Sequence, residues 1–231
     1  MIEEDDDMTY QKLMTEPMPT YTKGEEVFNL VTHIIGGGFG LLVLIFSIVI
    51  AFMQKIDFYQ FFALSVFSIT CIVLYTISSI YHGLKPHRTS KRVMRIIDHC
   101  TIYLLIAGTY TPVCMLGLRG TIWCPIILAI EWLMAIGGIV MNAIDLNNKI
   151  VKIISMIFYI LGGWIVVFFP PAIKLLPFNA FLFILIGGVV YTIGSVLYGI
   201  GAKKKWYHSI FHIFCLGGTF IQFVGLLFLV F

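Results

Sequence analysis

The chain has 231 residues, of which 59% are hydrophobic and only 12% are charged, and its formal net charge at pH 7 is +3. Soluble domains carry about 25% charged residues, so this composition leaves too little polar surface for a water-soluble protein. It predicts a protein of the lipid bilayer, and the small net charge gives no reason to expect a nucleic-acid partner.

The chain begins with an acidic segment, residues 1–23, that contains Glu3, Glu4, Asp5, Asp6 and Asp7. A secretory signal would instead begin with basic residues and continue into an apolar core. Because acidic, poorly hydrophobic segments cannot bury enough apolar surface to fold, we expect a disordered tail here. The membrane domain is then expected over 24–231.

Seven apolar runs follow, each long enough for a transmembrane helix, which needs about 20 residues to cross ~30 Å of hydrocarbon. They cover residues 28–53, 58–81, 99–118, 121–144, 153–173, 178–202 and 207–231. The connections between them are short, so consecutive helices are expected to run antiparallel. The predicted fold is an all-α membrane protein, a bundle of seven transmembrane helices.

Basic residues predict the orientation of this bundle. Three of them, Lys55, Arg119 and Lys174, fall on one side of the predicted topology, and twelve fall on the other. The twelve are Lys12, Lys23, Lys85, Arg88, Lys91, Arg92, Arg95, Lys149, Lys152, Lys203, Lys204 and Lys205. Because cytoplasmic loops are rich in Lys and Arg, the N-terminus is expected in the cytoplasm and the C-terminus outside. This topology is opposite to that of G-protein-coupled receptors.

Ionisable side chains lie near the predicted cytoplasmic ends of several helices, where their cost in a membrane points to function. His82 ends the second run, and Asp98 precedes the third. His208 and His212 begin the seventh run with a spacing that places both rings on one helix face.

Three neutral imidazoles with an open fourth position are a catalytic zinc arrangement. Each residue also has an ordinary explanation. The histidines can be interfacial or helix-end residues, and Asp98 can stabilise a helix N-terminus through the helix dipole. Their shared depth favours a metal site.

A further stripe of polar side chains, Glu26, Asn29 and His33, begins the first helix with helical spacing. In helix four, Glu131 is a lone carboxylate. It is expected either to be protonated and bonded to a neighbouring helix or to belong to a proton pathway, with Gln222 as one candidate partner.

Together these motifs resemble the progestin and adipoQ receptor family, and most closely its haemolysin III branch. The likeness covers residues 24–231. It rests on Ser78-x3-His82, Asp98 followed by His99, His208-x3-His212, Glu26-x2-Asn29-x3-His33 and the stretch Ile106-Ala107-Gly108-Thr109-Tyr110-Thr111-Pro112.

The resemblance implies a zinc ion bound by His82, His208 and His212. Asp98 would hold the water at the metal, and Ser78, one turn before His82, would support the site. The implied activity is hydrolysis of a lipid amide such as a ceramide-like lipid, because zinc makes water a nucleophile at neutral pH and a carboxylate can take its proton.

Two other functions stay open at this point: a haemolysin that permeabilises membranes, and a receptor or sensor whose zinc is structural. Too few polar residues follow any one helix to line a dedicated pore. The chain is expected in the plasma membrane. Its sequence defines neither the acyl chain of a lipid substrate nor the oligomeric state.

Overall fold

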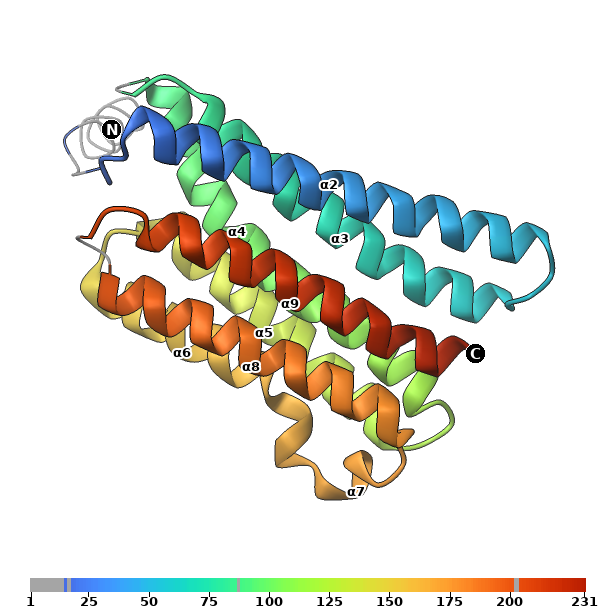
Figure 1. Cartoon of the computed structure of the whole chain (residues 1–231). Helices are drawn as coiled ribbons and strands as arrows, with labels where there is room; N and C mark the ends of the chain where they lie inside the picture. Colours follow the sequence, from blue (N-terminus) through green and yellow to red (C-terminus); the bar gives the residue numbers. More distant parts are fainter. Residues whose placement is uncertain (1–14, 16–17, 87, 202–203) are drawn as a thin grey trace, which may run out of the picture.

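The computed structural model describes residues 15, 18–86, 88–201 and 204–231, which form a bundle of α-helices (Figure 1). The helices are α2 (Lys23–Phe52), α3 (Phe58–Gly83), α4 (Thr89–Pro112), α5 (Trp123–Asp145), α6 (Lys149–Gly163), α7 (Pro170–Ile173), α8 (Phe178–Gly201) and α9 (Tyr207–Val230). A π-helical turn, η1 (Val113–Gly117), follows α4, and a 3-10 turn, η2 (Ile165–Phe168), follows α6.

Six helices among the described residues are long and apolar enough to cross a membrane: α2, α3, α4 with its π-helical extension, α5, α8 and α9. Their outward surfaces are apolar, as the 66% exposure of Leu42, the 67% of Leu133 and the 76% of Ile144 illustrate. Such side chains are stable outside the bundle only where hydrocarbon surrounds them. The predicted multi-pass membrane architecture is therefore confirmed.

The fifth predicted span, 153–173, is not one continuous helix. α6 has 15 residues and ends at Gly163, and η2 and the four-residue α7 follow it. The hydroxyl of Tyr110 donates to the Gly163 carbonyl at 2.9 Å, and Pro170 and Pro171 have no amide hydrogen with which to continue a helix. The described part of the chain thus has six helices of spanning length, and a broken segment stands where the fifth span was predicted.

Capping boxes fix where α2 and α3 begin. The Thr22 hydroxyl accepts from the Glu25 backbone N–H, while the Glu25 carboxylate accepts from the Thr22 backbone N–H at 2.8 Å. Asp57 and Gln60 make the same reciprocal pair at the start of α3. Each pair satisfies amide groups that the first helical turn leaves without a partner.

The third predicted span begins ten residues earlier than expected, at Thr89. Asp98 therefore lies in the third turn of α4, about 14 Å from its start, and not at the helix end. A helix dipole acts on charges within the first turn, so it does not account for Asp98.

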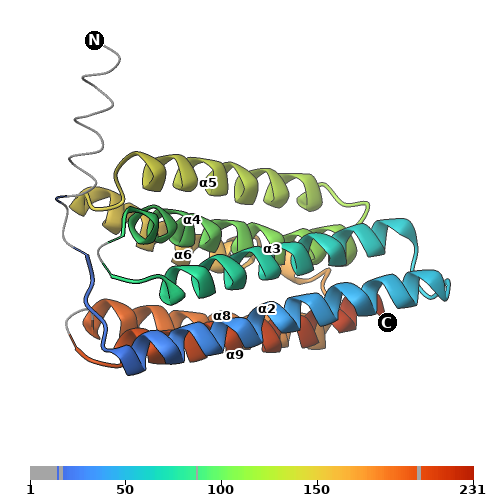
Figure 2. The same ribbon diagram turned by 90° about the horizontal axis from the view of Figure 1, so that it is seen from above.

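α2 and α9, which lie far apart in the sequence, are neighbours. α2 packs against both α3 and α9, α9 packs extensively against α8, and α5 lies on the far side of the bundle (Figure 2). Glycine allows the closest of these approaches: a Cβ atom on Gly36 of α2 would lie 2.5 Å from the Tyr75 ring of α3. This arrangement brings α2, α3 and α9 together at the end of the bundle where the described chain begins.

Candidate metal centre

Three histidines from two helices converge at that end. His82 is in the last turn of α3, and His208 and His212 are in the first two turns of α9. Nε2 of His208 lies 3.3 Å from Nε2 of His82 and 3.0 Å from Nε2 of His212. His82 is 3% and His212 is 2% exposed.

This spacing fits a zinc ion. Nitrogen ligands at ~2.0–2.1 Å with tetrahedral angles lie about 3.3–3.4 Å from one another, close to the two separations observed here. All three candidate ligand atoms lie within 4.8 Å of one another, and they form the one group of this kind found in the described part of the chain. Three imidazoles arranged in this way can hold one metal ion and leave its fourth position open.

Glu26 of α2 sets the orientation of the His82 ring. Oε2 of Glu26 is 2.7 Å from Nδ1 of His82, and its Oε1 accepts from Lys91 Nζ at 2.7 Å. Lys91 also donates to the carbonyls of Tyr81 and Leu84, so the carboxylate is held in place. A carboxylate at Nδ1 keeps the proton on that atom and leaves the lone pair of Nε2 free for a metal.

Asn29 and His33 complete the polar stripe of α2. Nδ2 of Asn29 is 3.5 Å from Nδ1 of His82. The His33 ring stacks on the His212 ring with centroids 3.8 Å apart and planes 18° apart. The stripe expected from the helical spacing of Glu26, Asn29 and His33 therefore lies directly against two of the three converging histidines.

The start of α9 is held by the neighbouring carboxylate, Glu25. Its Oε1 accepts from the backbone N–H of Trp206 at 2.6 Å. Trp206 has a φ of 68°, a left-handed conformation that is uncommon for residues other than glycine. Glu25 thus stabilises the sharp turn into α9 and sets the position of His208 two residues later.

Tyr21 is part of the site, and nothing in its sequence context pointed to it. Its ring stacks on His208 with centroids 4.9 Å apart and lies 5.7 Å from the His82 ring. Burial raises the pKa of the Tyr21 phenol above its ordinary value, so the side chain stays neutral at physiological pH. Residues 1–14, 16 and 17 of the predicted tail lie outside the described residues, whereas Met18 contacts Arg95 through its sulfur and Tyr21 contacts two of the histidines.

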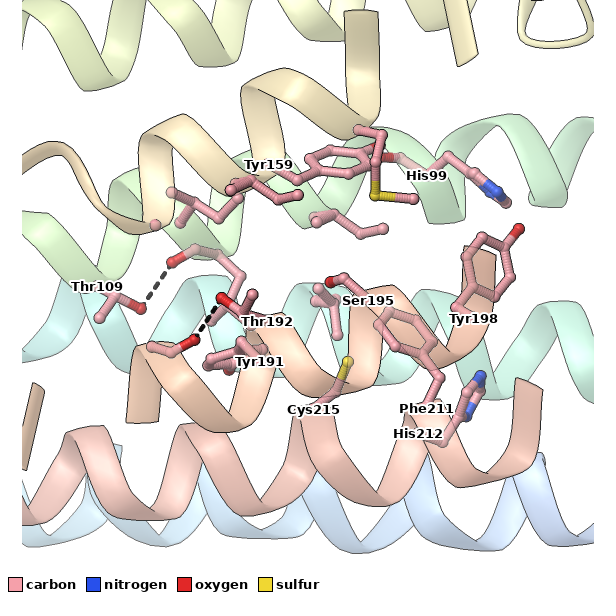
Figure 3. A pocket seen from close by; sticks show the side chains of 18 of the residues that line it. His99, Thr109, Tyr159, Tyr191, Thr192, Ser195, Tyr198, Phe211, His212 and Cys215 are labelled. Carbon is pink, nitrogen blue, oxygen red and sulfur yellow. Dashed lines mark hydrogen bonds between the residues drawn. The ribbon is translucent and has the colours of Figure 1, made fainter. Parts of the chain in front are cut away.

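Asp98 and Ser78 line the same cavity as His208 and His212. Ser78 is within hydrogen-bonding reach of the Asp98 carboxylate. The cavity has a volume of about 130 Å³, and its lining also includes Tyr191, Thr192 and Gln222. His212 and Tyr198 lie at one end of this space and Thr109 at the other (Figure 3).

His99, which directly follows Asp98 in α4, also lines this cavity. Its Nδ1 donates to the Arg95 carbonyl at 2.9 Å and lies 3.9 Å from Oδ2 of Asp98. The α4 backbone and Asp98 thus fix its ring at the cavity wall.

Glu131 is 2% exposed, and its Oε1 has no hydrogen-bond partner within the described part of the chain. Its other oxygen, Oε2, would lie 3.4 Å from a Cβ atom on Gly162, beside the point where α6 breaks. Gln222 instead lines the central cavity. The structure gives the two residues no shared hydrogen bond.

Comparison with known proteins identifies the family. Residues 21–223 match the family described as haemolysin-III related. Hemolysin-3 of Bacillus cereus is 34% identical over 220 residues, which cover 94% of this chain and 98% of that protein. The Hemolysin-3 homolog of Bacillus subtilis strain 168 is 34% identical over 211 residues, covering 90% and 95% of the two chains. The chain is therefore a multi-pass integral membrane protein of the haemolysin III-related family, within the progestin and adipoQ receptor family.

Proposed function

We propose that the protein is a zinc-dependent hydrolase of lipid amides, with a ceramide-like lipid as substrate. The observation that carries this proposal is the shared cavity. One end holds two of the three converging imidazoles together with Asp98 and Ser78, and the cavity continues between apolar helix faces. A lipid can therefore place its amide at the polar end and its acyl chain between the helices.

Bound zinc would polarise the amide carbonyl and make water a stronger nucleophile. The chain's own residues supply the proton transfers. The Asp98 carboxylate takes a proton from the attacking water and delivers it to the leaving amine, so that a fatty acid and an amine are released. Ser78, which faces Asp98, would donate to this carboxylate and orient it, and Glu26 orients His82.

A second function, permeabilisation of membranes, is favoured by the names of the two Hemolysin-3 relatives. It differs from hydrolysis in needing no chemical step. A third function, a receptor or sensor with a structural metal, would use the same three histidines. Leakage of a dye from proteoliposomes, measured beside hydrolysis in the same vesicles, separates the first two.

We expect proteoliposomes that contain the protein to release fatty acid from a ceramide, and a zinc chelator to abolish this release. Metal removal acts on the step that makes water nucleophilic, so added zinc should restore the activity. Vesicles without protein are the control. Dye leakage without hydrolysis of any of several lipid amides would favour the haemolysin function.

We also propose that the N-terminus and the loop between α3 and α4 face the cytoplasm, that the C-terminus faces outside and that the membrane is the plasma membrane. The support is the twelve-to-three distribution of basic residues. A single cysteine placed at Lys85 should resist a membrane-impermeant maleimide in intact cells, whereas one at Lys55 should react. Labelling with the opposite pattern would invert the topology and place the histidines at the outer face.

A further inference from the structure

Gly37 and Gly38 of α2 are not required for close helix packing, in contrast to Gly36 and Gly40 on the same helix. Gly36 and Gly40 lie against α3, where a Cβ atom would meet the Tyr75 ring at 2.5 Å and Cys71 and Ile72 at 3.0 Å. A Cβ atom on Gly38 would meet nothing within 4 Å, and one on Gly37 would meet only Thr76 and Tyr75, at 3.6 Å or more. Glycine lowers the stability of a helix by ~1 kcal/mol relative to alanine. Close packing does not explain why this cost is accepted at Gly37 and Gly38.

Gly37 and Gly38 instead leave an open groove between α2 and α3. The groove has a volume of about 330 Å³ and is lined by Ile34, Gly38 and Leu41 of α2 and by Ile72 and Thr76 of α3. Ile34 is 56% and Leu41 is 50% exposed on the surface that faces hydrocarbon. The groove therefore opens sideways into the bilayer.

His33 also lines this groove. It is 4% exposed, and neither of its ring nitrogens has a hydrogen-bond partner among the described residues. A buried polar group without a partner is costly, so the ring is expected to bond to something that arrives from elsewhere.

His33 also lines the central cavity and stacks on His212. The same imidazole thus belongs to the lining of the groove, which opens to the bilayer, and to the lining of the cavity that holds Ser78 and Asp98.

We propose that the groove between α2 and α3 is the lateral entrance through which an acyl lipid leaves the bilayer for the cavity, and that His33 hydrogen-bonds the lipid's amide. This inference rests on the proposed function for its substrate. The occupant is a lipid because the groove walls are apolar and face hydrocarbon. It bears an amide because an imidazole can donate to its carbonyl or accept from its N–H.

The test fills the groove without disturbing the packing. Gly38→Leu places a side chain in open space, and Gly137→Leu is its matched control, because a Cβ atom on Gly137 of α5 likewise meets nothing within 4 Å. We expect Gly38→Leu to lower hydrolysis of a long-chain ceramide at least tenfold and Gly137→Leu to leave it unchanged. The rate of hydrolysis by Gly38→Ala should lie between those of Gly38→Leu and the wild-type protein, so the test does not depend on the folding of one variant.

A second measurement does not require turnover. A long-chain ceramide with a diazirine in its acyl chain should cross-link wild-type protein at residues 34–41, and Gly38→Leu should abolish this label. His33→Phe, which keeps an aromatic ring beside His212, should raise KM about fivefold, the effect of one lost hydrogen bond, with zinc content unchanged.

Equal activity and equal cross-linking in Gly38→Leu and Gly137→Leu would overturn the entrance, as would an unchanged KM in His33→Phe. Failure of the proposed function looks different. Wild-type protein would then hydrolyse no ceramide, while the cross-linking comparison would still decide whether lipid enters between α2 and α3.

Discussion

Purified wild-type protein is expected to contain about one zinc ion per chain, and His208→Ala/His212→Ala less than a tenth of that. His208 and His212 supply two of the three imidazoles whose Nε2 atoms converge, and one remaining imidazole does not hold zinc against dilution. The measurement is metal analysis of detergent-purified protein by mass spectrometry. Its control is the size-exclusion profile, which should remain that of a folded chain.

Variants of the residues around the three histidines should lose zinc affinity to different extents. Glu26→Gln removes the carboxylate at His82 Nδ1 and should weaken zinc binding about 10- to 100-fold, the usual effect of losing such a partner. Ser78→Ala should weaken it less than His82→Ala, since Ser78 reaches Asp98 and not a ring nitrogen. Full zinc occupancy in the double histidine variant would rule out the site.

Asp98→Asn is expected to retain zinc and to lose turnover by about 100- to 10,000-fold, the range that general acid–base catalysis contributes. Asparagine has nearly the shape of aspartate, but its amide cannot take the proton of the attacking water. The assay is release of fatty acid from ceramide in proteoliposomes, with zinc content measured on the same preparation.

Asp57→Asn is the matched control. Asp57 lies at the other end of the bundle, where its 49% exposed side chain pairs with Arg119 at 2.8 Å, and this guanidinium lowers the pKa of the Asp57 carboxyl. Turnover of ceramide should therefore be unchanged in Asp57→Asn. If Asp98→Asn hydrolyses ceramide as fast as Asp57→Asn does, Asp98 is not the base, and a structural metal becomes the better interpretation.

Much of the fold could be predicted from hydropathy, because a membrane helix must be long and apolar. The run 178–202 closely matches α8 (Phe178–Gly201), and the run 207–231 closely matches α9. Hydropathy did not predict the start of α4, because basic residues interrupt the apolar run before residue 99 although the helix begins at Thr89. It also failed at Trp164, because hydropathy does not register a local break in the backbone.

Those parts of the candidate site that depend on residue spacing within one helix could be predicted from the sequence. The parts that depend on which helices pack side by side could not. The stripe of Glu26, Asn29 and His33 follows from turns of 3.6 residues. That α2 lies beside α9, so that His33 meets His212, is a property of packing. Tyr21 and Lys91 were missed because one precedes a helix and the other belongs to a run of basic residues with an ordinary role in topology.

The division of the three histidines between α3 and α9 has a consequence for biosynthesis. The chain is made from its N-terminus, so His82 is available early, whereas His208 and His212 arrive with the last helix. A chain interrupted before Trp206 carries one of the three imidazoles and lacks the Trp206 backbone N–H that donates to Glu25 in the turn into α9. Zinc binding by all three imidazoles, as proposed, would therefore distinguish a completely inserted chain from a truncated one.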